Sequence, residues 1–296
     1  MKKLVYSKAI TTLCLGIILG TSMNGIAQTA PPVTEKLIPY GDFNSWMVRI
    51  IDESFVIGGN TKILYEVAPV DTIRGAVPYN SSPVSPWRTS NVMAKVSGVT
   101  KCSISVFPEK RGDGQCVRLE TLMENCKVLG LVNITVLVPG TIYLGEMLEP
   151  IKDTKNPQSK LNAGIPFTET PKAVVLDYKM YIPETDHRIK ATGFSKIVNV
   201  PGRDSAEIYV ILQKRWEDAN GNVFAKRVGT VVERISETNP DWVNNHRLEI
   251  LYGDATGQPG YKPFMQLIPK EQSLYCLIKI LDKLLLTCVQ VSIIWL

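Results

Sequence analysis

The amino-acid sequence predicts an all-β protein built as an antiparallel β-sandwich, and three observations support this fold class. Residues 206–213 alternate apolar and mostly polar side chains, the period of two expected of a half-buried strand, with Ala206, Ile208, Val210 and Leu212 on the apolar side. Asn220-Gly221 can adopt the positive φ angles of a tight hairpin turn, after which residues 223–235 return as the partner strand. The chain also has 19 prolines and 21 glycines among many Val, Ile, Thr and Tyr residues, a composition typical of short strands and turns.

The first 27 residues have the pattern of a secretory signal peptide. Lysines precede the apolar run Ile10–Leu19, and small and polar residues continue to Ala27, where we expect cleavage to leave Gln28 as the first residue. The apolar run has about 10 residues, whereas a membrane-spanning helix needs roughly 20. We therefore expect an exported protein without a transmembrane helix after cleavage, with an uncleaved anchor as the alternative.

Cleavage would also change the charge balance of the chain. It removes three of the 33 basic side chains and none of the 28 acidic ones, so that 30 basic groups face 28 acidic groups and the net charge is +2. No basic stripe interleaved with aromatic residues remains, and we expect no nucleic-acid partner.

The main sandwich is expected over residues 41–275, after an exposed lead-in at residues 28–40. Loops are expected at residues 70–86 and 149–161, and a subdomain boundary near residues 150–165 is an open alternative. Turns are expected at Gly58-Gly59-Asn60 and at residues 108–114. Strands are predicted at residues 55–57, 61–67, 91–96, 102–107, 116–121, 128–138, 141–145, 172–182, 206–213, 223–235, 248–252 and 262–267.

The last segment, residues 276–296, differs from everything before it because it is strongly apolar and contains no glycine or proline. Its lightly polar part, residues 284–296, is 13 residues long and too short to cross a membrane as a helix. Three alternatives stay open for this tail: an amphipathic terminal helix, a final buried strand, or an altered reading frame that has replaced the true ending.

Cysteine and histidine usage restricts the chemistry. An oxidising compartment permits a Cys116–Cys126 disulfide that closes a short hairpin, although the spacing also suits two buried thiols. The chain has 2 histidines, His187 and His246, with no zinc-ligand spacing, so we expect no His/Cys metal site and no cofactor. A structural Ca²⁺ held by loop oxygens, for example at Gly112-Asp113-Gly114, is an open alternative.

Five segments resemble the putative carbohydrate metabolism domain family of secreted Bacteroidetes proteins. They are Ile38–Trp46, Ser85–Asn91, Arg118–Thr121, Gly164–Pro171 and Asp204–Val210, which together span most of residues 37–270. The resemblance implies a jelly-roll-like sandwich similar to carbohydrate-binding modules, and a role with polysaccharides. Members of the family have further closing strands after a position comparable to Tyr275, so the resemblance also implies that C-terminal strands are missing here.

Sugar binding requires flat aromatic faces for the C–H side of a pyranose, together with amides and carboxylates for its hydroxyl groups. Trp87, between Pro86 and Arg88 in a predicted loop, is the favoured aromatic residue, with Asn91 as its polar neighbour. Trp242 and Tyr79 are the other binding candidates. Trp46 and Trp216 are expected to fill the sandwich core or a sheet edge instead.

Glycoside hydrolysis requires two carboxyl groups roughly 5 to 10 Å apart across a cleft. Residue type admits Glu120, Asp177, Asp204, Glu207 and Glu217, but the sequence does not bring two of them together, so the catalytic residues are unknown. The predicted function is non-catalytic recognition of a polysaccharide or glycan at the cell envelope, in the periplasm, on the outer-membrane surface or outside the cell. The alternatives are a glycoside hydrolase or lyase with a carboxylate pair, and a structural or adhesin-like envelope protein.

Overall fold

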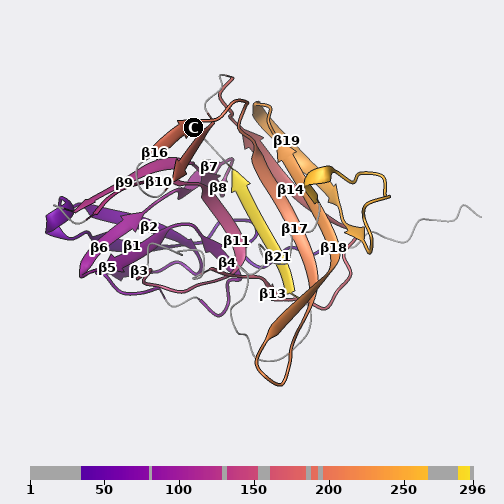
Figure 1. The fold of residues 1–296 in the computed structure, drawn as a ribbon, viewed down its shortest axis with the longest axis horizontal. Helices are drawn as coiled ribbons and strands as arrows, with labels where there is room; N and C mark the ends of the chain where they lie inside the picture. The colour runs from indigo at the N-terminus through magenta and orange to yellow at the C-terminus, as the bar shows by residue number, and fades with distance from the viewer. Residues whose placement is uncertain are drawn as a thin grey trace, which may run out of the picture. The chain divides into compact units, whose positions relative to one another are not determined.

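The computed structural model describes residues 35–79, 82–128, 132–152, 161–184, 188–192, 196–265 and 286–293. Residues from Leu37 onward form one compact unit. Its described part consists of β-strands and two short 3-10 helices, as Figure 1 shows, which confirms the all-β fold class. The expected signal peptide lies outside the described residues. No helix in the described ranges is long and apolar enough to span a membrane.

The first half of the unit is built mainly from antiparallel hairpins, because short connections return each strand beside its predecessor. Strand β1 (Trp46–Asp52) pairs with β2 (Thr61–Val67), and β3 (Thr72–Arg74) lies parallel to β1. The other hairpins are β5 (Val92–Val96) with β6 (Val99–Ser103), β7 (Val106–Arg111) with β8 (Gly114–Leu119), and β9 (Leu122–Val128) with β10 (Val132–Val138). A later pair joins β15 (Ile189–Thr192) and β16 (Lys196–Asn199).

The largest sheet has 8 strands and brings together segments from most of the chain. Its main order is β12 (Leu161–Ala163), β11 (Gly140–Met147), β21 (Leu286–Ile293), β17 (Ala206–Glu217), β18 (Val223–Ile235) and β20 (Leu251–Tyr252). Strand β4 (Trp87–Thr89) adds to β11, and β13 (Ile165–Pro166) adds to β21.

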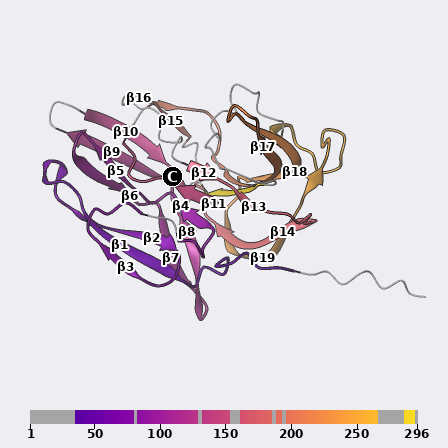
Figure 2. The same cartoon turned by 90° about the horizontal axis from the view of Figure 1, so that it is seen from below.

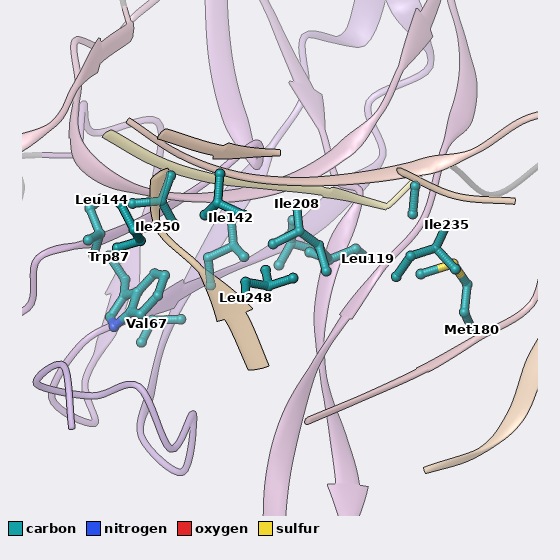
Figure 3. Close-up of a cluster of buried hydrophobic side chains, with 14 of the residues drawn as sticks. Val67, Trp87, Leu119, Ile142, Leu144, Met180, Ile208, Ile235, Leu248 and Ile250 are labelled. Carbon is teal, nitrogen blue, oxygen red and sulfur yellow. The ribbon is translucent and has the colours of Figure 1, made fainter. Parts of the chain in front are cut away.

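A second layer, β14 (Ala173–Met180) paired with β19 (Asn239–Glu249), covers one face of this sheet (Figure 2). Ile208, Val210 and Leu212 of β17 belong to the same buried cluster as Leu248 of β19 and Met180 of β14, part of which Figure 3 shows. Removing a side chain of this size from water contributes about 1.5–3 kcal/mol. Two sheets joined through a shared apolar core make the fold a β-sandwich, as predicted.

The β17–β18 hairpin confirms the alternation predicted for it. The exposed fractions of Ala206, Ile208, Val210 and Leu212 are 0%, 2%, 1% and 1%. The predicted turn is present as well, because Gly221 has φ +79° and the Asp218 carboxylate accepts hydrogen bonds from the backbone amides of Asn220 and Asn222.

Two predicted strands are 3-10 helices. Residues 55–57 form η1 (Phe55–Ile57), which ends where the Gly58 amide donates to the Phe55 carbonyl at 2.9 Å and Gly58 takes φ +114°. The predicted hairpin across residues 58–60 is therefore wrong, and β2 pairs with β1 instead. Near the other end, η3 (Pro263–Met265) lies where a strand was predicted at residues 262–267, of which residues 266–267 are outside the described part of the chain.

The turn predicted at residues 108–114 is too long. Strand β7 continues through Pro108 to Arg111, and the reversal is confined to Gly112 and Asp113. Pro108 is accommodated because β7 pairs on one side only, with β8, in the described residues.

The tail contributes a strand to the large sheet. Strand β21 pairs antiparallel with β11 through residues 290–293 and with β17 through residues 286–292. This pairing agrees with the final-strand alternative for residues 286–293. Residues 276–285 and 294–296 lie outside the described part of the chain.

Cys116 is a free thiol on β8, which corrects the disulfide alternative. The cross-strand partner of Cys116 is Glu109 on β7, whereas Cys126 on β9 pairs with Ile134 on β10. The two cysteines thus belong to different hairpins. Cys102 is also free and is fully buried.

Candidate functional site

Trp87 lies inside the protein, so its predicted place in an accessible loop is wrong. It is the first residue of β4, its side chain belongs to the main core cluster, and it is 6% exposed (Figure 3). Its indole nitrogen donates to the Pro39 carbonyl at 2.9 Å, and the Phe43 ring meets it edge-on at 5.1 Å. The hydrogen bond to Pro39 ties the lead-in to the core, and burial of the indole leaves no accessible ring face for a sugar.

Asn91 is buried as well and serves the backbone around it. Its amide nitrogen donates to the carbonyls of Tyr65 and Val106 at 2.9 and 2.8 Å, and its amide oxygen accepts from the amides of Ser105 and Val106. The side chain therefore links β2, β5 and β7 and has no hydrogen-bonding capacity left for a ligand.

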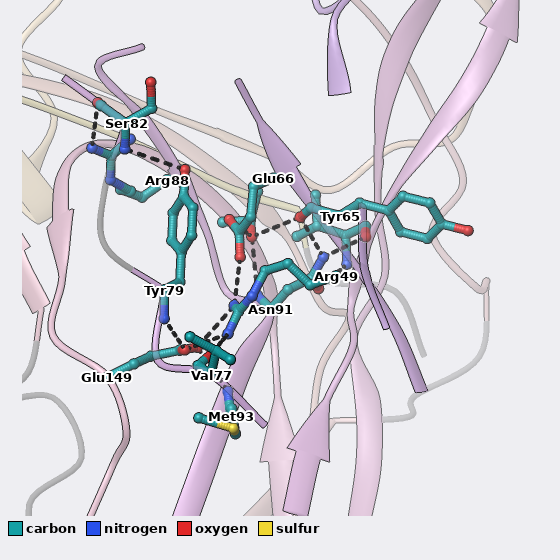
Figure 4. A network of polar contacts seen from close by, with 12 residues as sticks. Arg49, Tyr65, Glu66, Val77, Tyr79, Ser82, Arg88, Asn91, Met93 and Glu149 are labelled. Atoms are coloured by element: carbon teal, nitrogen blue, oxygen red, sulfur yellow. Dashed lines mark hydrogen bonds and ion pairs between the residues drawn. The ribbon is translucent and has the colours of Figure 1, made fainter. Parts of the chain in front are cut away.

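Tyr79 is 4% exposed and lies beside a buried charge network that the sequence did not reveal (Figure 4). The guanidinium of Arg49 contacts Glu66 at 3.1 Å and Glu149 at 2.5 Å, and lies 5.2 Å from the centre of the Tyr79 ring. Glu149 was expected in a surface loop, yet its side chain is 1% exposed and also accepts from the amides of Tyr79 and Met93. The sequence did not predict this network, because its three charged residues are at positions 49, 66 and 149, far apart along the chain.

The charges of this network explain its electrostatics. The Arg49 guanidinium lies between two carboxylates. Burial raises the pKa of Glu66 to about 7; the positive charge of Arg49 opposes this rise, and the negative charge of Glu149 adds to it. Burial lowers the pKa of Arg49. Its hydrogen bonds and charge interactions with Glu149 and Glu66 raise the pKa by more than burial lowers it, so the pKa is raised overall. With all three side chains at or below 4% exposure, the network holds strands together and does not meet substrate.

Trp242 is the one predicted binding residue that the structure leaves partly accessible. It lies on the outer face of the β14–β19 layer, opposite the core, where Asp177 and Lys179 also point outward. The Arg111 guanidinium, from the end of β7, lies 3.8 Å from the centre of the Trp242 ring, and the Lys179 ammonium lies 5.6 Å from it. We refer to Trp242, Asn244, Asp177, Lys179, Arg111 and Glu109 as the Trp242 surface.

Polar contacts hold the Trp242 surface in place. Arg111 donates to Asp177 at 2.6 Å and to the Asn244 side-chain oxygen at 2.8 Å. Lys179 pairs with Glu109 at 3.2 Å. A hydrogen bond from the Asn245 amide, together with Arg111, lowers the pKa of Asp177 against the smaller effect of burial. Asp177 is therefore ionised at neutral pH and is an acceptor, not a proton donor.

The other candidate carboxylates are distributed over separate parts of the fold. Glu120 pairs with Arg118, Asp204 with Arg188 at 3.9 Å, and Glu207 with Arg234 at 2.6 Å. Glu207 and Glu217 lie on one strand ten residues apart, a separation of about 33 Å. That distance is far beyond the roughly 5 to 10 Å of a glycosidase pair.

Metal-binding groups do not gather in the part of the chain that the structure describes. Within those ranges no cluster of three or more His, Cys, Asp and Glu side chains could hold an ion. His246 instead contacts Glu233 at 2.9 Å and the edge of the Tyr178 ring. His187 lies outside the described residues, and a calcium site stays a prediction.

The remaining tryptophans differ from each other. Trp46 is 6% exposed, and its indole nitrogen donates to the Phe43 carbonyl, as expected of a core residue. Trp216 was expected to fill the core or a sheet edge, but it is 47% exposed and stacks on Phe224. It lies where the β17–β18 hairpin extends past the core.

Comparison with known proteins gives a family and two distant structural likenesses. Residues 61–264 match the putative carbohydrate metabolism domain. No curated protein matches the chain. A putative glycoside hydrolase from Bacteroides thetaiotaomicron VPI-5482 is 15% identical with a TM-score of 0.41, covering 78% of this chain and 67% of that chain. A putative glycoside hydrolase from Bacteroides vulgatus ATCC 8482 is 11% identical with a TM-score of 0.34, and the match covers 70% of this chain and 88% of that chain.

The family match includes most of the strands described above, from β2 to β20, and therefore both layers of the sandwich. It extends over more than half of the chain. This chain belongs to the putative carbohydrate metabolism domain family.

Proposed function

We propose that this protein binds a carbohydrate at the Trp242 surface without cleaving it. The observation that carries the proposal is the position of Trp242: of the four predicted binding residues, it is the one on an outward face, and hydrogen-bonding side chains surround it. An indole ring offers an apolar face to the C–H side of a pyranose, and the neighbouring groups suit its hydroxyls.

The neighbours of Trp242 supply both kinds of hydrogen-bonding partner. Asp177, Glu109 and the Asn244 oxygen are acceptors, and Arg111 and Lys179 are donors. Arg111 already lies against one face of the indole ring, so a sugar would use the ring's rim or other face. The sugar hydroxyls would also form hydrogen bonds with polar side chains that at present bind one another.

Binding without hydrolysis agrees with the charge and ion pairing of the carboxyl groups at the Trp242 surface. Hydrolysis requires one carboxyl group that stays protonated near neutral pH. At the Trp242 surface the pKa of Asp177 is lowered, and Glu109 contacts both Lys179 and Arg118. Among the described carboxyl groups, the one whose pKa is clearly raised is Glu66, which is buried outside the Trp242 surface.

We also propose that residues 1–27 direct export and are then removed, on the sequence pattern given above. Mass spectrometry of protein recovered from the periplasm or the medium would show a chain that begins at Gln28. Recovery of the uncleaved chain from the cytoplasm would contradict this.

Affinity gel electrophoresis of the mature protein tests the binding proposal. With soluble neutral and acidic polysaccharides in the gel, we expect at least one to retard the protein. Trp242→Ala should weaken that retardation at least about tenfold, because a stacking face is lost, while Trp242→Phe should restore part of it. Phe55→Ala is the matched control, since Phe55 is an aromatic side chain that is 91% exposed on η1, outside the Trp242 surface.

Three results would contradict the proposal. Retardation that is the same for Trp242→Ala and Phe55→Ala would place binding elsewhere. Release of reducing ends from the polysaccharide, abolished by Asp177→Asn or Glu109→Gln, would favour the hydrolase alternative. If no polysaccharide retards the protein, the structural or adhesin-like alternative is favoured.

A further inference from the structure

The turn end of the β17–β18 hairpin extends beyond the neighbouring strands (Figure 1), and it carries a second aromatic surface. Trp216 and Phe224 are cross-strand partners there, their ring centres lie 5.6 Å apart and their planes differ by 13°. They are 47% and 39% exposed. Neighbouring exposed aromatic rings form an apolar surface of the kind found at ligand-binding and interaction sites.

The side-chain period along β17 shows how the face with Trp216 relates to the core. Ile208, Val210 and Leu212 point into the core. The ladder has a bulge after Leu212, where the extra residue, Val228, lies on β18, so along β17 the two-residue period places Lys214 and Trp216 on that same face. Leu212, which faces Gly229, is the last residue of β17 in the core cluster of the described residues, and Lys214 and Trp216 beyond it are exposed. The hairpin thus presents the continuation of a core-facing surface to solvent.

Two lysines lie beside the aromatic pair on this face. Lys214 and Lys226 are directly opposite each other in the β17–β18 ladder, next to the Trp216–Phe224 pair, and both are exposed. Among the described residues neither ammonium has a carboxylate within 4.0 Å. Like charges directly opposite in a sheet repel each other, and an anion between them would relieve that repulsion.

The nearby carboxylates of Glu217 and Asp218 do not form ion pairs with these lysines. Glu217 has the opposite parity on β17 and so belongs to the other face of the hairpin. The Asp218 carboxylate is used within the turn, where it accepts from the Asn220 and Asn222 amides and the Asn222 side chain. Among the described residues, the face with Trp216 and Phe224 therefore carries the charges of two lysines that no carboxylate pairs with.

We propose that this hairpin face binds an acidic polysaccharide, with a uronic acid ring against the exposed aromatic pair and its carboxylate between Lys214 and Lys226. The argument rests on charge complementarity and on the aromatic rings, and it does not depend on binding at the Trp242 surface. The Trp242 surface differs from it, because the cations there are already paired with Asp177 and Glu109.

Binding to polygalacturonate, with uncharged dextran and galactan for comparison, tests this inference in the mature protein. We expect polygalacturonate to bind and its affinity to fall with added salt. Trp216→Ala and the double variant Lys214→Gln with Lys226→Gln should each weaken binding about fivefold or more. The double variant should also have a smaller salt dependence.

Matched controls separate this surface from general charge effects and from the Trp242 surface. Lys95→Gln with Lys152→Gln removes the same charge from exposed positions elsewhere and should leave binding unchanged. Unchanged circular dichroism and thermal unfolding would show that the hairpin variants are folded. Loss of neutral-glycan binding in Trp242→Ala, with polygalacturonate binding kept, would show that the two surfaces act separately.

Several outcomes would overturn the inference. One is polygalacturonate binding that is absent, equal to that of dextran, or unaffected by the hairpin variants. Another is binding to anionic phospholipid vesicles, but not to polygalacturonate, that Trp216→Ala removes, which would assign the hairpin to a membrane. A third is concentration-dependent dimerisation that Trp216→Ala abolishes, which would assign it to a second copy of this chain.

Discussion

Asn91 and Glu149 each satisfy several backbone or charged groups with a single side chain. Asn91 makes four hydrogen bonds to backbone groups, and Glu149 accepts from Arg49 and from the amides of Tyr79 and Met93. An unpaired polar group in such a place costs about 1–3 kcal/mol. The sequence indicates Asn91 as a binding candidate because it is polar and close to Trp87, yet the hydrogen bonds of both side chains are used within the fold.

Glu66 makes the stability of the protein depend on pH. Burial raises the pKa of its folded-state carboxyl group from 4.5 to about 7. The folded state therefore holds a proton that the unfolded state releases, and this stabilising contribution is complete below pH 4.5, declines as pH rises, and is lost above about pH 7. Glu66→Gln keeps the shape of the side chain and removes the titration.

We expect the free energy of unfolding to fall less between pH 5 and pH 8 in Glu66→Gln than in the wild type, by on the order of 1–3 kcal/mol. Urea unfolding at both pH values measures this difference. Glu249→Gln, at an exposed pair with Arg247, is the control and should keep the wild-type pH dependence. A Glu66→Gln protein with the wild-type dependence would show that Glu66 is ionised throughout.

At the scale of elements, close approaches of backbone fix how the hairpins join the large sheet. Gly140 begins β11, where a Cβ atom would lie 2.4 Å from the Glu120 amide nitrogen and 2.6 Å from the Ser105 carbonyl oxygen. Both are backbone atoms and cannot rotate away. The junction between β11 and the residues that flank β7 and β8 therefore requires glycine.

Gly140→Ala should lower the free energy of unfolding by about 1–3 kcal/mol or more, because the backbone must move apart to admit the methyl group. Thermal or urea unfolding measures the change. Gly257→Ala is the matched control, since nothing lies within 4 Å of a Cβ there, and its effect should stay within about 1 kcal/mol. Equal effects of the two substitutions would contradict the close approach at Gly140.

At the scale of the whole molecule, β21 joins parts of the chain that are far apart in sequence. It lies between β11 and β17 in the large sheet and pairs with both (Figure 1). Without it, both strands would have an unpaired edge in the middle of the sheet. Unpaired edges expose amides and carbonyls that readily pair with other chains.

A chain that ends at residue 275 should therefore aggregate or fail to fold. We expect a large loss of monomer in size-exclusion chromatography compared with the full chain, together with a lower unfolding temperature. A chain that ends at Ile293 keeps β21 and is the control. A monomeric, cooperatively folded chain ending at residue 275 would contradict a structural role for β21.

Much of the fold was predictable because its signals are local. Alternation along residues 206–213 and the Asn220-Gly221 turn specified a strand and a hairpin that the structure confirms. The misassigned segments at residues 55–57 and 263–265 are short, and short apolar runs suit a strand or a helical turn equally well. The candidate site was less predictable: Trp242 is on a surface as required, whereas Trp87, Asn91 and Tyr79 are buried.

The amino-acid sequence by itself determined the all-β class, the long hairpin and the family resemblance, because side-chain period, turn chemistry and motif order are properties of neighbouring residues. Only the tertiary structure decided which aromatic and charged side chains face solvent. Exposure depends on what packs against a residue from distant segments, as Arg49, Glu66 and Glu149 or Trp242 and Arg111 show. The same strand buries Leu212, which belongs to the core cluster, and exposes Trp216, which lies beyond the last of its residues in that cluster.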